Sequence, residues 1–284
     1  MIEPELAGAA LADDLRSAHP REGEASVWRL GQSGIVVKLA GATVLIDAYL
    51  SNHCEALLGE PFDHRRMTRS PLDPVDLDLL DLIICSHDHL DHLDPPTLRT
   101  LARQNPRAKV AAPRAAVATL EQLGWSPDRI IACDDGAEVD MGALRIASFA
   151  VPHDEFDEGP DGYPYLGWII EGSGVRVAHL GDARSHPRVT AVLARASVDL
   201  LAVPINGRSA ERAAMGFAGN MNAAEAVELG MASGAAEVLP MHYDMFEQNV
   251  DPDALTRFVQ TADAARLASV VLPVGRRHVI RGAR

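Results

Sequence analysis

A short apolar run that ends in a cluster of metal-binding side chains most constrains how this chain can fold. Residues 80–85, Leu-Asp-Leu-Ile-Ile-Cys, are typical of a buried strand. The seven residues that follow, from Ser86 to His92, include three histidines and two aspartates. Because α/β proteins usually place their chemistry on loops that leave the carboxyl ends of strands, this cluster predicts a functional site at the edge of a sheet.

The spacing within the cluster favours metal binding. His87 and His89 alternate along an extended segment, so their side chains share one side. After the chain turns, Asp91 and His92 can reach the same place from another direction. Neutral imidazoles and carboxylates are ligands of zinc, manganese and iron. The alternative is a solvated polar loop in which the histidines occur by chance and share no function.

Three further metal-binding side chains follow apolar runs downstream. His153 comes after residues 143–149, Asp182 ends residues 175–182, and His242 ends residues 236–242. Each could be an ordinary loop residue when taken alone. Together with the first cluster, they predict that several strand ends deliver ligands to one point.

These residues resemble the metal-site motifs of the metallo-β-lactamase superfamily. Residues 87–92, His-Asp-His-Leu-Asp-His, match its HxHxDH signature, and the three later residues follow in the superfamily's order. The resemblance implies an α/β fold in the form of a four-layer αββα sandwich. It also implies two divalent metal ions, with zinc or manganese expected and iron possible. One metal would be held by His87, His89 and His153, the second by Asp91, His92 and His242, and Asp182 would bridge the two.

Flanking segments resemble one branch of the superfamily, the L-ascorbate-6-phosphate lactonases and their relatives. The similar pieces are residues 28–35, 180–182, 206–208 and 240–244. This resemblance implies a hydrolase in which a metal-bridging hydroxide opens a sugar lactone, and the expected substrate is phosphorylated. Asp91 or Asp182 would carry the proton. A phosphodiesterase for a small phosphodiester or cyclic phosphate is the alternative. A non-catalytic relative that kept the fold also stays open.

Asp47 closes the apolar run 43–47 and is expected to orient a metal-binding imidazole, although an ordinary turn carboxylate fits equally well. Asn206 and Arg208 follow another apolar run and are expected to contact the substrate, with loop capping as the alternative.

The connection over residues 49–78 is long enough to form a lid, and it holds a small basic cluster. Arg66, or its neighbour Arg65 or Arg69, would bind an anionic group of the substrate. The alternative is a surface loop whose arginines pair with Asp63 or Asp73.

Composition narrows the remaining classes. The 284 residues are 47% hydrophobic and 23% charged, as expected for one globular domain over residues 1–284. A formal net charge of −14 argues against binding to nucleic acid but does not indicate the substrate. The resemblance and the basic cluster lead us to expect an anionic small molecule as the partner. The three cysteines show no metal-binding spacing. The start of the chain does not resemble a signal peptide, and apolar runs stay short of the ~20 residues of a membrane helix. We therefore expect a cytoplasmic protein that does not bind membranes, and a homo-oligomer is possible.

The periodicity predicts alternating strands and helices. Asn222 and Glu225 form the pattern of a capping box that opens a helix. The expected strands include residues 26–30, 34–39, 43–48, 109–112, 130–133, 200–205 and 269–273. The expected helices are residues 95–103, 114–123, 187–195, 223–232 and 252–264.

Overall fold

Two mixed β-sheets form the centre of the molecule in the computed structural model, which describes residues 1–59 and 63–282. The first sheet has the strand order β13-β1-β2-β3-β4-β5-β6 and the second has the order β12-β11-β10-β9-β8-β7. The strands of the first sheet are β1 (Glu24–Gly31), β2 (Gly34–Leu39), β3 (Ala42–Ile46), β4 (Leu82–Ile84), β5 (Lys109–Pro113), β6 (Ile130–Cys133) and β13 (Arg277–Arg281). Those of the second are β7 (Glu138–Asp140), β8 (Arg145–Ala150), β9 (Leu166–Gly172), β10 (Val175–His179), β11 (Leu200–Pro204) and β12 (Glu237–Met241).

The two sheets have apolar core on both faces, one core layer between them and one beneath the helices on each outer side. The strands therefore carry few polar residues. In β11, Leu200 and Ala202 face the core between the two sheets, whereas Leu201 and Val203 face the core beneath the outer helices. Successive side chains of a strand point to opposite faces, so a strand covered on both sides must be apolar throughout.

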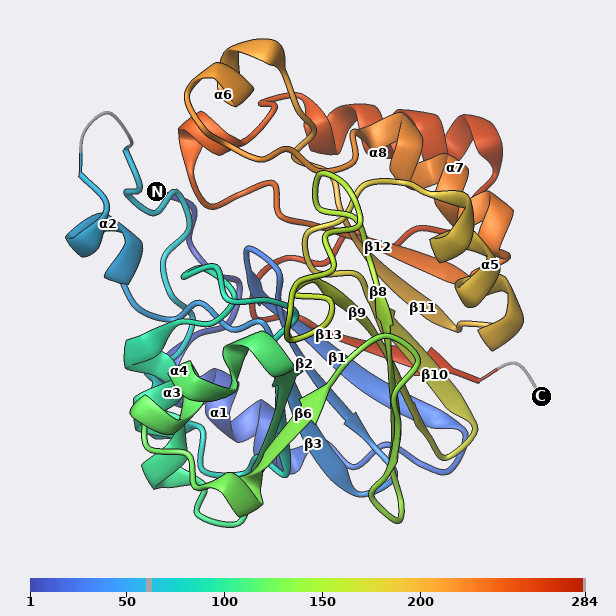
Figure 1. Ribbon diagram of the computed structural model, residues 1–284. Helices are drawn as coiled ribbons and strands as arrows, with labels where there is room; N and C mark the ends of the chain where they lie inside the picture. Colours follow the sequence, from blue (N-terminus) through green and yellow to red (C-terminus); the bar gives the residue numbers. More distant parts are fainter. Residues whose placement is uncertain (60–62, 283–284) are drawn as a thin grey trace.

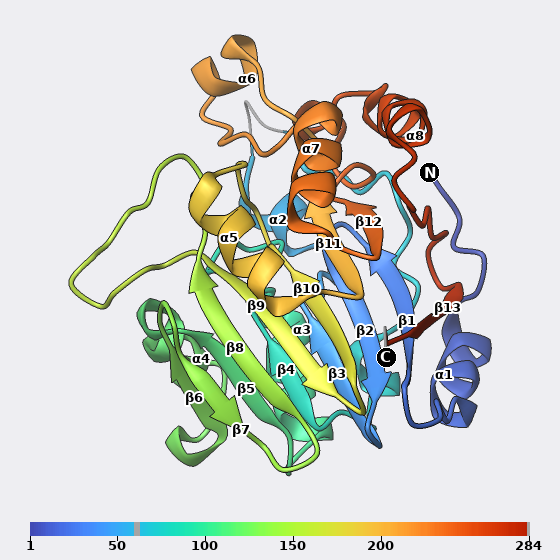
Figure 2. The same ribbon diagram turned by 90° about the vertical axis from the view of Figure 1, so that its right-hand side faces the viewer.

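Helices cover the outer face of each sheet, so that the layers run helix, sheet, sheet, helix (Figures 1 and 2). Helices α1 (Gly8–Ser17), α3 (Pro95–Gln104) and α4 (Val117–Gln122) lie on the first sheet, and α5 (Pro187–Ala196), α7 (Ala223–Ser233) and α8 (Ala254–Ala265) lie on the second. Two short helices, α2 (His53–Leu57) and α6 (Ala210–Ala214), stand at one end of the sandwich (Figure 1). The αββα sandwich expected from the sequence is confirmed.

Most expected elements form within one or two residues of their predicted bounds. The capping box is present in full at the start of α7, where the Asn222 side chain accepts from the backbone of Glu225 and the Glu225 side chain accepts from the backbone of Asn222. Helices α1, α2 and α6 were not expected. The predicted strand 269–273 was wrong, because this segment makes only an isolated bridge between Val238 and Ser269.

The strand directions gather the predicted site at one edge of the sandwich. Strands β3 and β4 are parallel neighbours in the first sheet, and β10, β11 and β12 are parallel neighbours in the second. Strand β8 runs in the same direction as β10, because both are antiparallel to β9. The loops that leave the carboxyl ends of β3 and β4 thus lie at one edge of the first sheet, and those of β8, β10 and β12 lie at one edge of the second. The two edges adjoin, because residues of these loops come together at the predicted site.

The long connection over residues 49–78 contains α2 and a 3-10 turn at Pro74–Asp76, and the part of the predicted lid at residues 60–62 lies outside the described residues. No helix among the described residues is long and apolar enough to cross a membrane.

Candidate metal centre

Side chains from four separate loops form two neighbouring groups that could each hold a metal ion. Within each group the potential ligand atoms lie within 4.8 Å of one another. The first group is His87, His89, His153 and Asp182, and the second is Asp91, His92 and His242. All seven residues predicted from the sequence are thus brought together.

Asp182 stands between the two groups. Its Oδ2 atom lies 3.8 Å from Nε2 of His153, on the side of the first group. Its Oδ1 atom lies 3.1 Å from Nε2 of His242 and 3.3 Å from Nε2 of His92, on the side of the second. One carboxylate can therefore offer an oxygen to each group.

The nitrogen and oxygen atoms of these groups are arranged to bind metal ions rather than to form hydrogen bonds with one another. Nε2 of His87, Nε2 of His92 and Oδ1 of Asp182 are buried and make no hydrogen bond of good geometry among the described residues, although the last two atoms lie 3.3 Å apart. Buried polar atoms are nearly always satisfied, so atoms without a partner that converge on one place point to an absent ligand. Imidazoles and carboxylates suit divalent transition metals.

Asp47 fixes the orientation of two imidazoles. Its Oδ2 atom lies 2.7 Å from Nδ1 of His92 and accepts a hydrogen bond of 2.5 Å from the Ser86 hydroxyl. The same hydroxyl lies 2.9 Å from Nδ1 of His87. A carboxylate on Nδ1 of His92 holds the proton on that nitrogen and leaves Nε2 free to bind a metal.

The turn before Asp182 depends on a glycine. Gly181 has a φ of +57°, and a Cβ atom at this position would lie 2.4 Å from the Ser86 hydroxyl oxygen. The Gly181 amide donates to Nδ1 of His179, whose Nε2 lies 2.8 Å from the carbonyl of Ser33. His179 therefore supports the turn and is not one of the converging ligands.

Gln32 is a residue of the site that the sequence reasoning missed. Its side-chain Nε2 lies 2.6 Å from Oδ2 of Asp91 and 3.1 Å from Nε2 of His242. Its backbone amide donates to Asp244, which also forms a buried ion pair with Arg29 at 2.6 Å. Gln32 lies in the segment 28–35 that carried the resemblance, so the signal was present in the sequence but had no assigned role.

The electrostatics of the ligands follow from their burial and their neighbours. Burial, together with the imidazoles of His92 and His89, holds the pKa of His87 well below its ordinary value, so this ring is neutral and able to bind a metal. Burial opposes charge on Asp182 as well, but the imidazoles of His242 and His92 outweigh it and hold its pKa well below the usual range. Asp182 is therefore a carboxylate.

The second group behaves differently before a metal binds. Burial alone would lower the pKa of His242, but the carboxylates of Asp182 and Asp91 raise it to about 9. The pKa of His92 is also raised, against burial, by the carboxylates of Asp182, Asp91 and Asp47. In the metal-free protein, the protons on His242 and His92 thus supply the positive charge that a metal ion would supply.

The residues expected to bind the substrate lie outside the cavity next to the ligands. The Arg66 guanidinium is buried and donates to the carbonyls of Tyr49, Ser51 and Thr68. Arg208 pairs with Glu225 at 2.6 Å. Both guanidinium groups therefore make hydrogen bonds within the protein, although one terminal nitrogen of Arg66 is buried without a partner among the described residues.

Asn206 is fully buried and has structural partners. Its side-chain nitrogen donates to the carbonyl of Asn249, and its side-chain oxygen accepts from Asn220. These bonds tie together two loops at the edge of the cavity, which agrees with the capping alternative.

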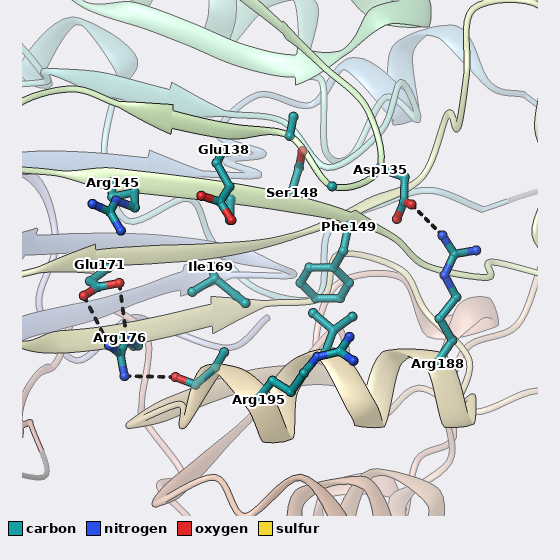
Figure 3. A pocket seen from close by; sticks show the side chains of 15 residues that line it. Asp135, Glu138, Arg145, Ser148, Phe149, Ile169, Glu171, Arg176, Arg188 and Arg195 are labelled. Atoms are coloured by element: carbon teal, nitrogen blue, oxygen red, sulfur yellow. Dashed lines mark hydrogen bonds and ion pairs between the residues drawn. The ribbon is translucent and has the colours of Figure 1, made fainter.

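The cavity at the site has a volume of about 480 Å³ and reaches from the ligands to α2 and to the loop after α6. A second hollow, of about 560 Å³, lies between the second sheet and α5 (Figure 3). It contains the ion pairs Arg188–Asp135 and Arg176–Glu171 over an apolar floor, but none of the predicted ligands lines it. The chemistry therefore belongs to the first cavity.

Comparison with known proteins agrees with this geometry. A family described as "Beta-lactamase superfamily domain" matches residues 42–243, which include both groups of ligands. The chain belongs to the metallo-β-lactamase superfamily. Within the superfamily it is 32% identical, over 238 residues, to a "UPF0173 metal-dependent hydrolase" of Hyperthermus butylicus, a match that covers 81% of this chain and 89% of the relative. It is a member of the UPF0173 family.

Solved structures share the superfamily fold. A possible metal-dependent hydrolase from Veillonella parvula matches with a TM-score of 0.72 and 15% identity, covering 89% of this chain and 98% of its own. An isothiocyanate hydrolase from Delia radicum gut bacteria matches with a TM-score of 0.70 and 15% identity, covering 90% and 99%. At these identities the likeness shows the fold alone.

Proposed function

We propose that this chain is a dinuclear metal-dependent hydrolase that opens a lactone or cleaves a related ester. The observation that carries the proposal is the pair of ligand groups joined by Asp182, whose two oxygens face different groups. The UPF0173 relative named as a metal-dependent hydrolase supports it.

His87, His89, His153 and Asp182 would hold one ion, and Asp182 would share the other with Asp91, His92 and His242. Two divalent cations, when bound, lower the pKa of water toward neutrality and polarise a carbonyl oxygen. Zinc, manganese and iron all suit these ligands.

The protein's own residues position the groups and move the proton. The carboxylates of half-buried Asp91 and buried Asp182 are ionised, since neighbouring imidazoles hold their pKa values below the usual range. Either can accept the proton that water loses and return it to the departing oxygen. The Gln32 amide, 2.6 Å from Asp91 Oδ2, fixes the direction of that carboxylate.

A lactone or ester is preferred to a phosphodiester because of the cavity lining. Among the described residues that line it there is no lysine or arginine to pair with phosphate oxygens. The lactonase branch of the superfamily, which the flanking segments resemble, supports the same preference.

Metal analysis and a substrate panel test the proposal. Protein purified without chelator is expected to carry about two metal ions per chain by elemental analysis. The panel would contain lactones, aryl esters and bis-p-nitrophenyl phosphate, assayed with zinc-loaded and manganese-loaded protein.

The variant His89→Ala should lose turnover to the background rate together with part of the bound metal, because it removes a ligand of the first group. His19→Ala, which removes an exposed imidazole outside the site, is the matched control and should retain both. Metal-loaded protein without turnover of any ester, lactone or phosphodiester would instead indicate a non-catalytic relative.

A further inference from the structure

The cavity beside the metal centre has two chemically different halves. One half consists of the ligands and their loop, with His89, Asp91, His153 and Asp182 at the surface. The opposite half comes from α2, from the loop after α6 and from the segment after β12. Its apolar members are Cys54, Leu58, Phe217, Ala218 and Phe246, and its polar members are His64 and Asn249.

Aromatic packing holds the apolar half in place. Phe246 is buried and stands edge-on to Tyr49, with ring centroids 5.7 Å apart. The His64 ring packs edge-on against Phe246 at 5.1 Å and lies 6.2 Å from the Phe217 ring. Leu58, at 37% exposure, completes the wall at the end of α2. A substrate at the candidate metal centre therefore meets a formed, largely apolar surface within the same cavity.

Among the described residues that line the cavity there is no lysine or arginine to pair with an anionic group at this end. The lining carboxylates are Asp88, Asp91 and Asp182, and once Asp91 and Asp182 are bound to metal, Asp88 still faces the cavity. The arginines of the basic cluster are engaged elsewhere, Arg65 with Asp63 and Arg69 with Glu3. A phosphate at this end of the substrate would lose hydration and would gain no ion pair with a lysine or arginine.

We propose, on the basis of the hydrolase function above, that the substrate is an uncharged lactone or ester with an apolar substituent seated against Leu58, Phe217 and Phe246. This differs from the anionic, phosphorylated substrate expected from the sequence. A volume of about 480 Å³ lies within the usual range of sites for small molecules.

The reaction needs no further reactant. The oxygen of water bonds to the carbonyl carbon, the acyl carbon–oxygen bond breaks, and the departing oxygen takes the proton, which gives a hydroxy acid or an acid and an alcohol. The product carboxylate is charged, so the apolar half and Asp88 favour its release.

A kinetic comparison of matched substrates tests this specificity. We expect metal-loaded protein to hydrolyse γ-lactones with increasing efficiency as an alkyl substituent lengthens from methyl to hexyl, by about threefold to fourfold in kcat/KM for each buried methylene. A phosphorylated sugar lactone should be the poorer substrate.

A charge placed in the wall should reverse the preference. Leu58→Arg introduces a cation into the cavity lining at a partly exposed position that tolerates a long side chain. We expect it to raise the ratio of kcat/KM for the phosphorylated lactone to that for the alkyl lactone by about tenfold, through attraction of the anion and loss of apolar contact. Leu57→Arg is the matched control, because residue 57 is 60% exposed and does not line the cavity, and its ratio should not change.

Binding of a non-hydrolysable analogue gives a second readout. Calorimetry with an alkyl-substituted γ-lactam should show a negative heat-capacity change on binding, the mark of apolar burial, and Phe217→Ala should make it smaller. Faster turnover of the phosphorylated lactone by the unaltered protein, or an equal shift in the two arginine variants, would overturn the apolar substrate and leave the hydrolase standing. Absence of any turnover by metal-loaded protein would overturn the proposed function instead.

Discussion

Three residues of the site have positive φ angles, which residues other than glycine rarely adopt. Gln32, Asp47 and His242 have φ values of +51°, +45° and +62°. Each follows a strand and turns its side chain toward the ligands, and such conformations cost about 1–3 kcal/mol each. Hydrogen bonds hold them in place, since the His242 amide donates to the Gln32 carbonyl and the Asp47 amide donates to the Ile84 carbonyl.

Asp47 should control metal affinity without being a ligand. Asp47→Asn keeps the size of the side chain and tolerates the positive φ, but it removes the charge that holds the proton on Nδ1 of His92. We expect metal affinity to fall by about 10-fold to 100-fold, measured by competition with a chromophoric chelator. Asp81→Asn, an exposed carboxylate that caps the Thr43 amide, is the control. Equal affinities in the two variants would contradict this role.

Metal binding should release protons at neutral pH. The pKa of His242 is raised to about 9 in the metal-free protein, so its imidazole is protonated at pH 7 and must lose that proton to bind a metal. Falling pH therefore weakens metal binding, and the release should fade as the pH rises through about 9. Calorimetric titrations in buffers of different ionisation enthalpy measure the number of protons. A release that stayed constant from pH 7 to pH 10 would contradict the protonated state.

At the scale of elements, the sequence predicted those whose ends carry a side-chain signal. Helix α7 has a complete capping box and was predicted closely. Helix α1 begins after Ala7, has no side-chain cap and has no acidic residue in its first turn, so its start has no local mark. Helices α2 and α6 have five residues each, too few for a helical period to show.

The cap of α7 gives a prediction about stability. Asn222→Ala removes the oxygen that accepts from the Glu225 amide and should lower the free energy of unfolding by about 1 kcal/mol. Asn222→Ser keeps a capping oxygen and should lose much less. The midpoint of urea unfolding measures both. If serine were as damaging as alanine, the capping bond would not be the source of the loss.

At the scale of the whole molecule, the metal centre joins the two sheets. The loop after β4 of the first sheet supplies four of the candidate ligands, and the loops after β8, β10 and β12 of the second sheet supply the other three. Bound metals would therefore link the two sheets, which otherwise pack together through the apolar core alone.

Removal of metal should lower the stability of the whole fold. A ligand present at about 1,000 times its Kd stabilises the folded state by about 4 kcal/mol. For a chain of this size we expect chelation to lower the Tm by on the order of 10 °C, measured by differential scanning calorimetry. In His89→Ala the difference between loaded and chelated protein should shrink. An unchanged Tm after complete removal of metal would contradict the stabilising role.

The residues of the two candidate metal-binding groups could be predicted from the sequence because each lies in a loop that leaves an apolar strand. The apolar wall could not, because Leu58, Phe217 and Phe246 come from three distant segments with no common pattern, and only the tertiary fold brings them together. The role of Arg66 could not be predicted either. Its charge suggested that it binds an anion, but in the fold its guanidinium donates to three backbone carbonyls.

The positions of the ligands along the chain imply an order of maturation. A growing polypeptide has made every donor of the first group once residue 182 has been added, but the second group lacks an imidazole until His242 is made, sixty residues later. In the proposed two-metal centre, the first group would therefore be complete before the second, and the pair of sites would be among the last features that a nascent chain acquires.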